Sequence, residues 1–445
     1  MYWQEFRQTL RLSIPLIISN VAQVGLALID SAMVGAIDYK QLAASSLVIN
    51  AIGIPQVICM GLCIAITPLV SIARGRGDEL AASRYLYNGT VVATLGSILI
   101  ALACTLAMPL LDHLGQDPAI VAICKPYYLV MVWGLVPMTL FLSMKQFSDA
   151  LEHTRTGMLL ALLSLPLNAF LNWLLIFGHA GLPRLELFGA GIATTLSRII
   201  IVILMAGILW RHRVYQSYIR LRKAAWQLRR PVVKELLHIG IPSGLQLVME
   251  AGAFSISGIM VGWLGAEAQA AHQIALNCAS TTFMAVLGLA MGASIRASHA
   301  LGAGKPAQLK EIGKSTIIGG LLYGLATALL FVLLRRYLPL IFTTESAVVE
   351  SAATLLLVAA LFQASDSLQC IGAGLCRGIK DVKVPTALVT LAYWVIGLPV
   401  GYCLAFPLKL GAAGIWWGLV IGLSAAALLL NRRFLRRIAI STSAG

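Results

Sequence analysis

Charged residues are scarce in this sequence of 445 residues, because only 11% of them are charged and 59% are hydrophobic. Soluble domains have about 25% charged and about 45–50% apolar residues. Apolar runs of at least about 18 residues recur along the whole chain, each long enough to cross a bilayer core of about 30 Å. The shortage of charge therefore excludes a soluble globular protein and indicates an all-α polytopic membrane protein.

Paired cysteines and catalytic side-chain sets are also missing. The eight cysteines form no CxxC pair and lack metal-ligand spacing, so we interpret them as small buried hydrophobes and expect neither disulfides nor zinc. The stretch ASHALGAGKP fails as a phosphate-binding loop, because His299 replaces its first glycine and Pro306 its Ser/Thr. With no nucleophile–base set apparent, we expect a protein that is not an enzyme and carries no cofactor.

The formal net charge of +15 comes from basic residues that lie mainly between the apolar runs. This is the positive-inside signature, so nucleic acid is not an expected partner. The segment 211–235 alone holds eight Lys or Arg residues. We predict that it is a cytoplasmic linker that acts as a topological tether, with binding of anionic lipid or of a partner as the alternative. Both termini are then expected to be cytoplasmic.

Twelve membrane spans are predicted, and the first is not a signal peptide because its apolar run continues without a small-residue cleavage site. The predicted spans are 12–37, 46–73, 85–110, 119–144, 157–178, 188–210, 236–263, 271–300, 313–334, 350–373, 384–405 and 412–430.

An internal repeat divides these spans into two halves. Residues 14–77 align without a gap on 241–304, at an offset of 227, with 17 identities in 64 positions. Self-similarity of this kind indicates duplication. We predict two pseudo-symmetric six-helix lobes, an N-lobe of residues 1–210 and a C-lobe of residues 236–445. Duplicated halves are typical of alternating-access carriers with a site near the membrane midplane.

Three acids, Asp30, Glu250 and Asp366, lie inside predicted spans. Each costs about 2.5–3.5 kcal/mol near the bilayer centre, and no Lys or Arg is expected deep in the spans to neutralise them. A mobile cation is therefore the predicted counter-charge: a proton, Na⁺ or a cationic substrate. The alternative is a protonated acid used only in packing.

Polar residues accompany these acids at helical spacing. They are Gln23 before Asp30, Gln246 before Glu250, and Gln363 and Gln369 on either side of Asp366. Asn168 and Asn172 share one face of the fifth span, and amide oxygens are hard ligands suited to Na⁺. Interhelical hydrogen bonding is the equally weighted alternative for this asparagine pair.

The sequence resembles the multidrug and toxic compound extrusion (MATE) transporters, and in particular their bacterial NorM-like branch. The resemblance covers nearly the whole chain. It is carried by SIPLIISNVAQVGLALIDSAMVG, AAHQIALNCAS, FQASDSLQCIGAGLCRGIKDVKVP, AYWVIGLPVGY and GAAGIWWGLVIGL.

This resemblance implies efflux of cationic, often aromatic drugs in exchange for Na⁺ or H⁺. By motif match, Asp30 is similar to the family's N-lobe cation or proton acid, with Asn168, Asn172 and Thr194 as its neutral ligands. Glu250 and Asp366 are similar to the C-lobe acids that bind cation or drug. Phe362 departs from the family, in which a tyrosine often stands one turn before the span 10 acid, and this weakens the case for a strong C-lobe Na⁺ site.

We therefore expect a multidrug antiporter of the bacterial inner membrane, acting as a monomer on small cationic compounds in the lipid bilayer. A lipid-linked oligosaccharide flippase of the same superfamily is the main alternative, but it should line its cavity with Arg or Lys. A membrane-embedded enzyme or receptor is the alternative from another class, and the short loops argue against it.

Overall fold

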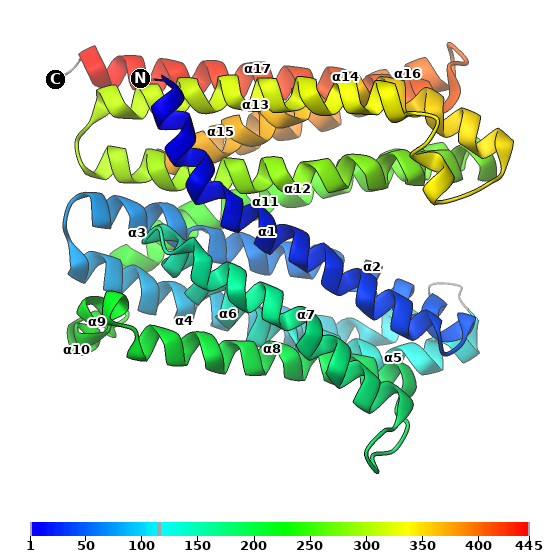
Figure 1. Cartoon of the computed structure of the whole chain (residues 1–445), viewed down its shortest axis with the longest axis horizontal. Helices are drawn as coiled ribbons and strands as arrows, with labels where there is room; N and C mark the ends of the chain where they lie inside the picture. Colours follow the sequence, from blue (N-terminus) through cyan, green and yellow to red (C-terminus); the bar gives the residue numbers. More distant parts are fainter. Residues whose placement is uncertain (1, 114–116, 444–445) are drawn as a thin grey trace. The chain divides into compact units, whose positions relative to one another are not determined.

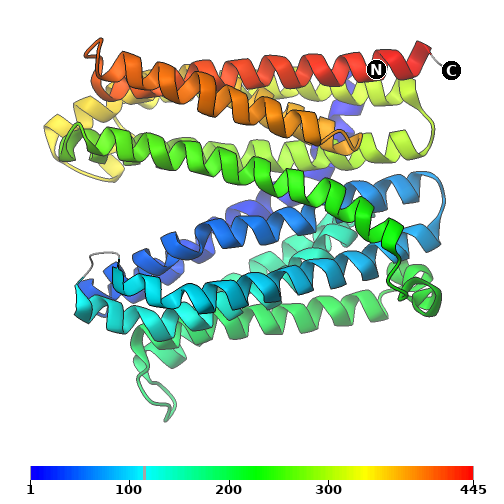
Figure 2. The same ribbon diagram turned by 180° about the vertical axis from the view of Figure 1, so that it is seen from behind.

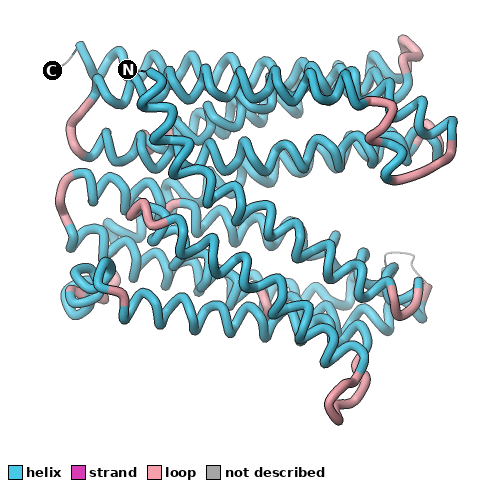
Figure 3. The backbone as a smooth tube through the Cα atoms, in the orientation of Figure 1, coloured by secondary structure: helices cyan, strands magenta, loops and turns pink. Residues whose placement is uncertain are grey.

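The computed structural model describes residues 2–113 and 117–443, the side chains of residues 222 and 440–443 excepted. Within these ranges the regular elements are all helices (Figure 3), so the predicted all-α class is confirmed. Among the described residues, twelve helical stretches are long and apolar enough to cross a membrane, and each overlaps one predicted span.

The helices, labelled as in Figure 1, are α1 (Tyr2–Gly35), α2 (Tyr39–Ile64), α3 (Ile66–Gly75), α4 (Glu79–Ala107), η1 (Met108–His113), α5 (Pro118–Trp133), α6 (Leu135–Ala150), α7 (Thr154–Phe177), α8 (Glu186–Arg211), α9 (Arg213–Arg220), α10 (Arg222–Ala225), α11 (Arg230–Gly262), α12 (Ala266–Gly302), α13 (Pro306–Leu334), η2 (Pro339–Ile341), α14 (Ser346–Gly378), α15 (Lys383–Thr390), η3 (Leu391–Gly397), α16 (Leu398–Ala405) and α17 (Gly411–Ser443).

Helix α1 begins at Tyr2, ten residues before the predicted first span. Arg296 of α12 explains this polar extension, because it donates hydrogen bonds to the Glu5 carbonyl oxygen (2.6 Å), to Thr9 Oγ1 (2.8 Å) and to the Glu5 carboxylate. An apolar run predicts only the part of a helix that crosses the membrane, whereas these tertiary bonds fix where the helix starts.

Three spans are interrupted helices. The second breaks at Ala65 between α2 and α3, and the fourth breaks at Gly134 between α5 and α6. The eleventh contains the π-helix η3, which ends just before Pro399. Proline has no N–H for the carbonyl four residues earlier, which disfavours the regular α-helical pattern there. π-helical turns often mark functional sites.

The chain forms two compact units whose boundaries cut through two helices. One unit comprises Ile18–Gly244, and the other comprises the chain up to Ile17 together with the chain from Leu245 onward. The first part of α1 therefore belongs with the C-terminal helices, and the first part of α11 with the N-terminal ones. The two boundary residues, Ile17 and Gly244, are 227 positions apart and so equivalent in the repeat.

The same equivalence governs how these helices pack. In the first unit, a β-carbon on Gly61 of α2 would lie 2.2 Å from the Gly244 Cα atom of α11. In the second unit, a β-carbon on Gly288 of α12 would lie 2.9 Å from the Ile17 Cα atom of α1. Gly61 and Gly288 are also 227 residues apart. Each unit thus contains the same glycine-dependent helix crossing, which duplication explains.

In the unit that contains the C-terminal helices, α14 and α17 are the most buried spans. Of the residues in the most apolar 18-residue stretch of each span, 50% are buried in Ser346–Gly378 and 61% in Gly411–Ala439. The two helices run side by side next to α13 (Figure 1). Polar side chains on α14 are therefore held in the interior of this unit.

The predicted linker 211–235 contains the two short helices α9 and α10. Tyr215 of α9 is only 1% exposed, and its hydroxyl lies 2.7 Å from Ser148 Oγ and 3.2 Å from Thr156 Oγ1. These bonds pin α9 to the ends of α6 and α7, and α9 and α10 lie at the same end of the unit as the start of α11 (Figure 2). The linker is therefore a docked element.

Candidate functional site

Four of the predicted site residues meet inside the unit Ile18–Gly244. Asp30 comes from α1, Asn168 and Asn172 from α7, and Thr194 from α8. Asn172 Nδ2 donates to Asp30 Oδ1 (2.7 Å), and Thr194 Oγ1 donates to Asp30 Oδ2 (3.2 Å). The i, i+4 spacing of the asparagines, read from the sequence, does place both on the face that meets α1 and α8. We call these four residues the Asp30 cluster.

The amides close the Asp30 cluster into a ring of hydrogen bonds. Asn172 Nδ2 also donates to Asn168 Oδ1 (3.0 Å), and Asn168 Nδ2 donates to Thr194 Oγ1 (3.3 Å). Both asparagines are fully buried and Thr194 is 4% exposed, whereas Asp30 is partly buried. Asn172 Oδ1 is buried and has no hydrogen-bond partner within the described part of the chain. One carboxylate thus lies among hard oxygen atoms of amide and hydroxyl groups, which are ligands that suit Na⁺, and the carboxylate itself can bind a proton.

Arg198 corrects the expectation that no basic residue lies deep in the spans. It stands one turn after Thr194 on α8, and its charge interacts with that of Asp30. Its Nη1 donates to the Gly134 carbonyl (3.0 Å), at the break between α5 and α6. A β-carbon on Gly134 would lie 3.1 Å from this guanidinium. A scan for apolar runs averages out a single arginine, and the sequence does not show that a helix break will receive it.

Two further buried basic residues lie at the ends of spans and not deep within them, Lys145 just beyond the predicted fourth span and Arg296 near the end of the eighth. Lys145 and Asp149 form an ion pair on α6 (2.8 Å) at 2% and 0% side-chain exposure. Arg296, described above, pairs with Glu5. Asp149 lies beyond the predicted end of the fourth span, so a buried pair of opposite charges was not foreseen. Each pair is internally neutral, which is how charge is tolerated inside a protein.

A second acidic cluster lies in the other unit, around Glu250 of α11. Gln369 of α14 donates through Nε2 to Glu250 Oε1, and Tyr393 Oη lies 3.5 Å from the same oxygen. Asp366 of α14, 5% exposed, interacts electrostatically with Glu250. Arg377, near the end of α14, also interacts with the Glu250 charge. We call Glu250, Asp366, Gln369 and Tyr393 the Glu250 cluster.

Further amides surround this cluster. Gln363 is 1% exposed and accepts a hydrogen bond from Thr282 (3.0 Å), while its Nε2 is buried without a partner. Gln246, one turn before Glu250, is 4% exposed. By contrast Gln23 is exposed on α1, and no hydrogen bond joins it to the Asp30 cluster among the residues described. The glutamine next to each C-terminal acid is therefore interior, and the N-terminal one is not.

Aromatic rings border the Glu250 cluster. Phe362 is 2% exposed, with its ring centroid 6.0 Å from that of Phe254 and 5.7 Å from that of Trp416. The position where relatives often have tyrosine thus offers a phenyl ring and no oxygen. Trp416 Nε1 donates to His272 Nδ1 (3.1 Å), so this histidine is engaged inside the core.

Sequence reasoning missed the two aromatic residues of η3. Tyr393 reaches Glu250, and Trp394 Nε1 donates to the Met249 carbonyl (3.0 Å) beside it. The only signal in the sequence was AYW placed shortly before a proline within an apolar run. The π-helical turn aims both side chains at α11, and this local geometry cannot be read from periodicity.

Comparisons with known proteins agree with this architecture. The MatE family model matches residues 15–174 and 242–403, and the two matches begin 227 residues apart (242 − 15), as the repeat does. The probable multidrug resistance protein NorM of Rhizobium meliloti is 34% identical over 451 aligned positions, covering 99% of this chain and 96% of that protein. Its counterpart in Bradyrhizobium diazoefficiens is 34% identical over 435 positions, covering 97% and 93%.

Solved structures share the fold. The eukaryotic MATE transporter AtDTX14 superposes with a TM-score of 0.86 at 20% identity, covering 98% of this chain and 99% of that one. A mutant of the Vibrio cholerae MATE transporter VcmN gives a TM-score of 0.87 at 20% identity, covering 98% of each chain. With both halves of the sequence matched by the family model, this multi-pass membrane protein belongs to the MatE family.

Proposed function

We propose that this protein is a secondary multidrug antiporter, which exports cationic aromatic compounds in exchange for Na⁺ or H⁺ by alternating access. The relatives named NorM are described as probable multidrug resistance proteins, which supports small-molecule efflux. The positive-inside pattern supports an inner membrane location with both termini in the cytoplasm.

The observation that carries the proposal is the Glu250 cluster. Glu250 and Asp366 place two interacting carboxylates within membrane-crossing helices, and the hydrogen bonds to Glu250 come from an amide and a phenol. Charge of one sign in such surroundings is costly unless a counter-charge is present. Arg377 interacts with the Glu250 charge but supplies only one positive charge for two carboxylates, so a further counter-charge is needed. A positive drug or coupling ion supplies this counter-charge, whereas a neutral or anionic substrate does not.

Aromatic side chains near the same acids suit an aromatic cation. The ring centroids of Phe254 and Tyr393 are 6.1 Å apart. Trp394 donates a hydrogen bond to the backbone carbonyl of the residue that precedes Glu250. A cation is attracted to the face of such rings by their quadrupole. The combination of acid and ring selects for compounds that carry both positive charge and apolar surface.

Exchange follows from competition for these carboxylates. When Na⁺ or H⁺ neutralises an acid, the attraction between that acid and a cationic drug is lost, and the drug is released. A ligand shifts a two-state equilibrium only through its differential affinity for the two states, and charge neutralisation supplies such a difference. A membrane potential of about 100 mV contributes about 2.3 kcal/mol per charge moved, enough for roughly fifty-fold accumulation.

The Asp30 cluster suits a coupling role better than drug binding. Its carboxylate is already bonded to Asn172 and Thr194 and interacts with the Arg198 charge. Its amide and hydroxyl groups are also bonded to one another, so a proton or a bare ion suits this cluster better than an aromatic compound does.

The buried basic residues do not favour a flippase for pyrophosphate-linked lipids. Lys145 and Arg296 each pair with an acid, and Arg198 donates to a backbone carbonyl while its charge interacts with Asp30. Cations with such partners are not available to bind a diphosphate.

Purified protein in liposomes tests the proposal directly. We expect uptake of a fluorescent cationic dye when an outwardly directed Na⁺ gradient or pH gradient is imposed across the vesicle membrane, and the gradient that supports uptake identifies the coupling ion. If the protein is monodisperse and folded but moves no dye under either gradient, the antiport proposal is contradicted.

Matched variants assign the acids. Asp30→Asn and Glu250→Gln are expected to reduce dye uptake to the background of empty liposomes. As a control for Asp30, Asp38→Asn removes an exposed acid that is close in the sequence. As a control for Glu250, Glu267→Gln removes an exposed acid from the next helix, α12, and both control variants should transport as wild type does. Full transport by both Asp30→Asn and Glu250→Gln would show that the two clusters have no part in exchange.

A further inference from the structure

The linker between the two halves carries a concentration of positive charge. The acids beside it are Glu235, which follows it in the sequence, and Glu79, whose charge interacts with Tyr218 of α9. Segment 211–234 contains no acid. Its seven described basic side chains are exposed and form no ion pair within the described ranges of the chain; they are Arg211, Arg213, Arg220, Lys223, Arg229, Arg230 and Lys234. A linker that only sets the membrane orientation needs positive charge but no fixed conformation. In this linker, the charged side chains lie on a segment whose backbone is hydrogen-bonded in a defined position.

Asn88 of α4 holds that backbone. This asparagine is 1% exposed; its Nδ2 donates to the carbonyl oxygens of Ala225 (3.3 Å) and Gln227 (3.4 Å). Its Oδ1 accepts from the Arg229 backbone N–H (3.1 Å). Six residues further along, Glu235 accepts a hydrogen bond from Tyr85, also on α4 (2.5 Å). Residues 225–229 are therefore fixed to the side of a membrane-crossing helix by one buried amide.

Held in this way, the segment turns apolar side chains outward. Trp226 is 66% exposed and Leu228 is 60% exposed, while Ala225, the last residue of α10, is fully buried. The Trp226 ring lies 5.5 Å from that of Tyr87, centroid to centroid. Tyr87 is eight residues into α4, or about 12 Å along the helix at 1.5 Å per residue. In the sequence, Tyr87 lies two residues inside the third predicted span, which begins at residue 85. The ring pair therefore lies near the end of an apolar run, and tryptophan is enriched at such membrane–water interfaces.

We propose that Trp226 and Leu228, together with Lys223 and Arg229, form a docking surface for the phosphate headgroup of an anionic phospholipid. The two apolar side chains enter the upper hydrocarbon region, and the two cations reach the phosphate from either side of Trp226. The linker then anchors the first unit to the leaflet that it faces.

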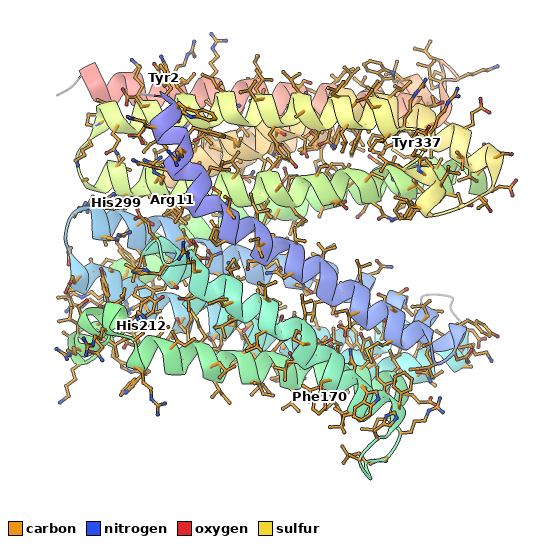
Figure 4. All side chains as sticks on the ribbon, in the orientation of Figure 1. Tyr2, Arg11, Phe170, His212, His299 and Tyr337 are labelled. Atoms are coloured by element: carbon orange, nitrogen blue, oxygen red, sulfur yellow. The ribbon has the colours of Figure 1, made fainter. Side chains whose placement is uncertain are left out.

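Lipid fits this surface better than a soluble protein partner does. Both ends of the linker continue into membrane spans, at Arg211 of α8 and Arg230 of α11, so the segment cannot leave the bilayer surface. The short helices α9 and α10 and the labelled residue His212 lie together at this end of the unit (Figure 4). The charge is complementary to an anionic leaflet, and basic residues close to such a surface each favour binding by about fivefold.

Brominated lipids test the docking surface, because bromine quenches the tryptophan that it touches. The full chain is reconstituted in phosphatidylcholine vesicles that contain an equal fraction of either brominated phosphatidylglycerol or brominated phosphatidylcholine. Subtracting the signal of Trp226→Phe isolates Trp226. We expect phosphatidylglycerol to be favoured over phosphatidylcholine at this residue, by up to about fivefold per engaged cation, and the preference to fall as NaCl is raised.

Charge variants separate this surface from general attraction. Lys223→Gln with Arg229→Gln should bring the lipid preference at Trp226 close to one. Arg432→Gln with Arg436→Gln removes two exposed cations from α17 and should leave the preference as it is in wild type. The proposal is overturned by equal quenching from both lipids in wild type, or by an equal loss in the two double variants. Quenching by neither lipid also overturns it, since Trp226 would then face water and a soluble partner.

Discussion

Helix α2 passes α11 so closely at Gly61 that a side chain has no room there. A β-carbon added at Gly61 would lie 2.2 Å from the Cα atom and 2.7 Å from the backbone nitrogen of Gly244. Ordinary van der Waals contact begins at 3.4 Å, so relief requires a shift of about 1.2 Å (3.4 − 2.2). Because the obstructing atoms belong to a backbone, no side-chain rotation can supply that shift. Gly61→Ala must therefore separate two helices.

The cost follows from comparison with a second glycine of the same helix. Gly53 has no heavy atom within 4 Å of its added β-carbon. Both substitutions gain the same helix propensity, about 1 kcal/mol for alanine over glycine, so this gain cancels between them. What remains is overpacking, which costs about 1–3 kcal/mol or more in a close-packed interior. We expect Gly61→Ala to be less stable than Gly53→Ala by this amount, or by several degrees in Tm.

Thermal unfolding of both variants in detergent, followed by loss of the monodisperse chromatographic peak, measures the difference. Gly288→Ala tests the equivalent crossing, because its β-carbon would lie 2.8 Å from the backbone nitrogen of Ile17. It should lose stability as Gly61→Ala does. If Gly61→Ala unfolds at the same temperature as Gly53→Ala or above it, the helices are not in close contact there and the argument for a duplicated crossing fails.

Three further predictions concern charged groups. Asp149→Asn leaves Lys145 buried without its counter-charge and should cost about 3–5 kcal/mol in thermal unfolding, most of it restored by adding Lys145→Met. Glu250→Gln should keep wild-type Tm while losing transport, because a glutamine oxygen still accepts from Gln369; a fall of many degrees would make the acid structural. Burial of His153, reinforced by neighbouring positive charges, lowers its pKa below the ordinary 6.5. The unfolded state therefore binds more protons, so Tm should be constant above about pH 6.5 and should fall below it. The drop should be smaller in His153→Gln, and an unchanged drop would assign it to other groups.

The fold was predictable because its signals are long. Each span is a run of apolar residues that no soluble element would need, and the repeat spreads its identities over 64 positions. Such patterns survive any single exception. Helix ends were predicted less well, since α1 continues to Tyr2 through bonds with Arg296, a residue nearly three hundred positions away. Long-range partners of this kind leave no local trace.

The clusters were predictable only in part, for the same reason. The acids stand out in the sequence because an ionisable group inside a membrane span costs free energy. Asn168 and Asn172 stand out because their i, i+4 spacing places them on one helix face. Arg198 and Tyr393 do not, because their roles depend on a helix break at Gly134 and on a π-helical turn. Both are departures from regular helix geometry, and periodicity carries information only about regular helices.

The scaffold of the two units is symmetric while their chemistry is not. The position equivalent to Asp30 is Ser257, which is fully buried and donates to the Ala253 carbonyl within its own helix (2.9 Å). The position equivalent to Glu250 is Gln23, which is exposed. Duplication therefore preserved the glycine crossings, whose loss would strain the backbone in either unit, but it did not preserve the acids. An acid inside a membrane needs a counter-charge, either a fixed one, as Lys145 is for Asp149, or an exchangeable one. Because Asp30 and Glu250 occupy non-equivalent positions with different neighbours, we expect the two clusters to hold different ions or to act at different steps of one cycle.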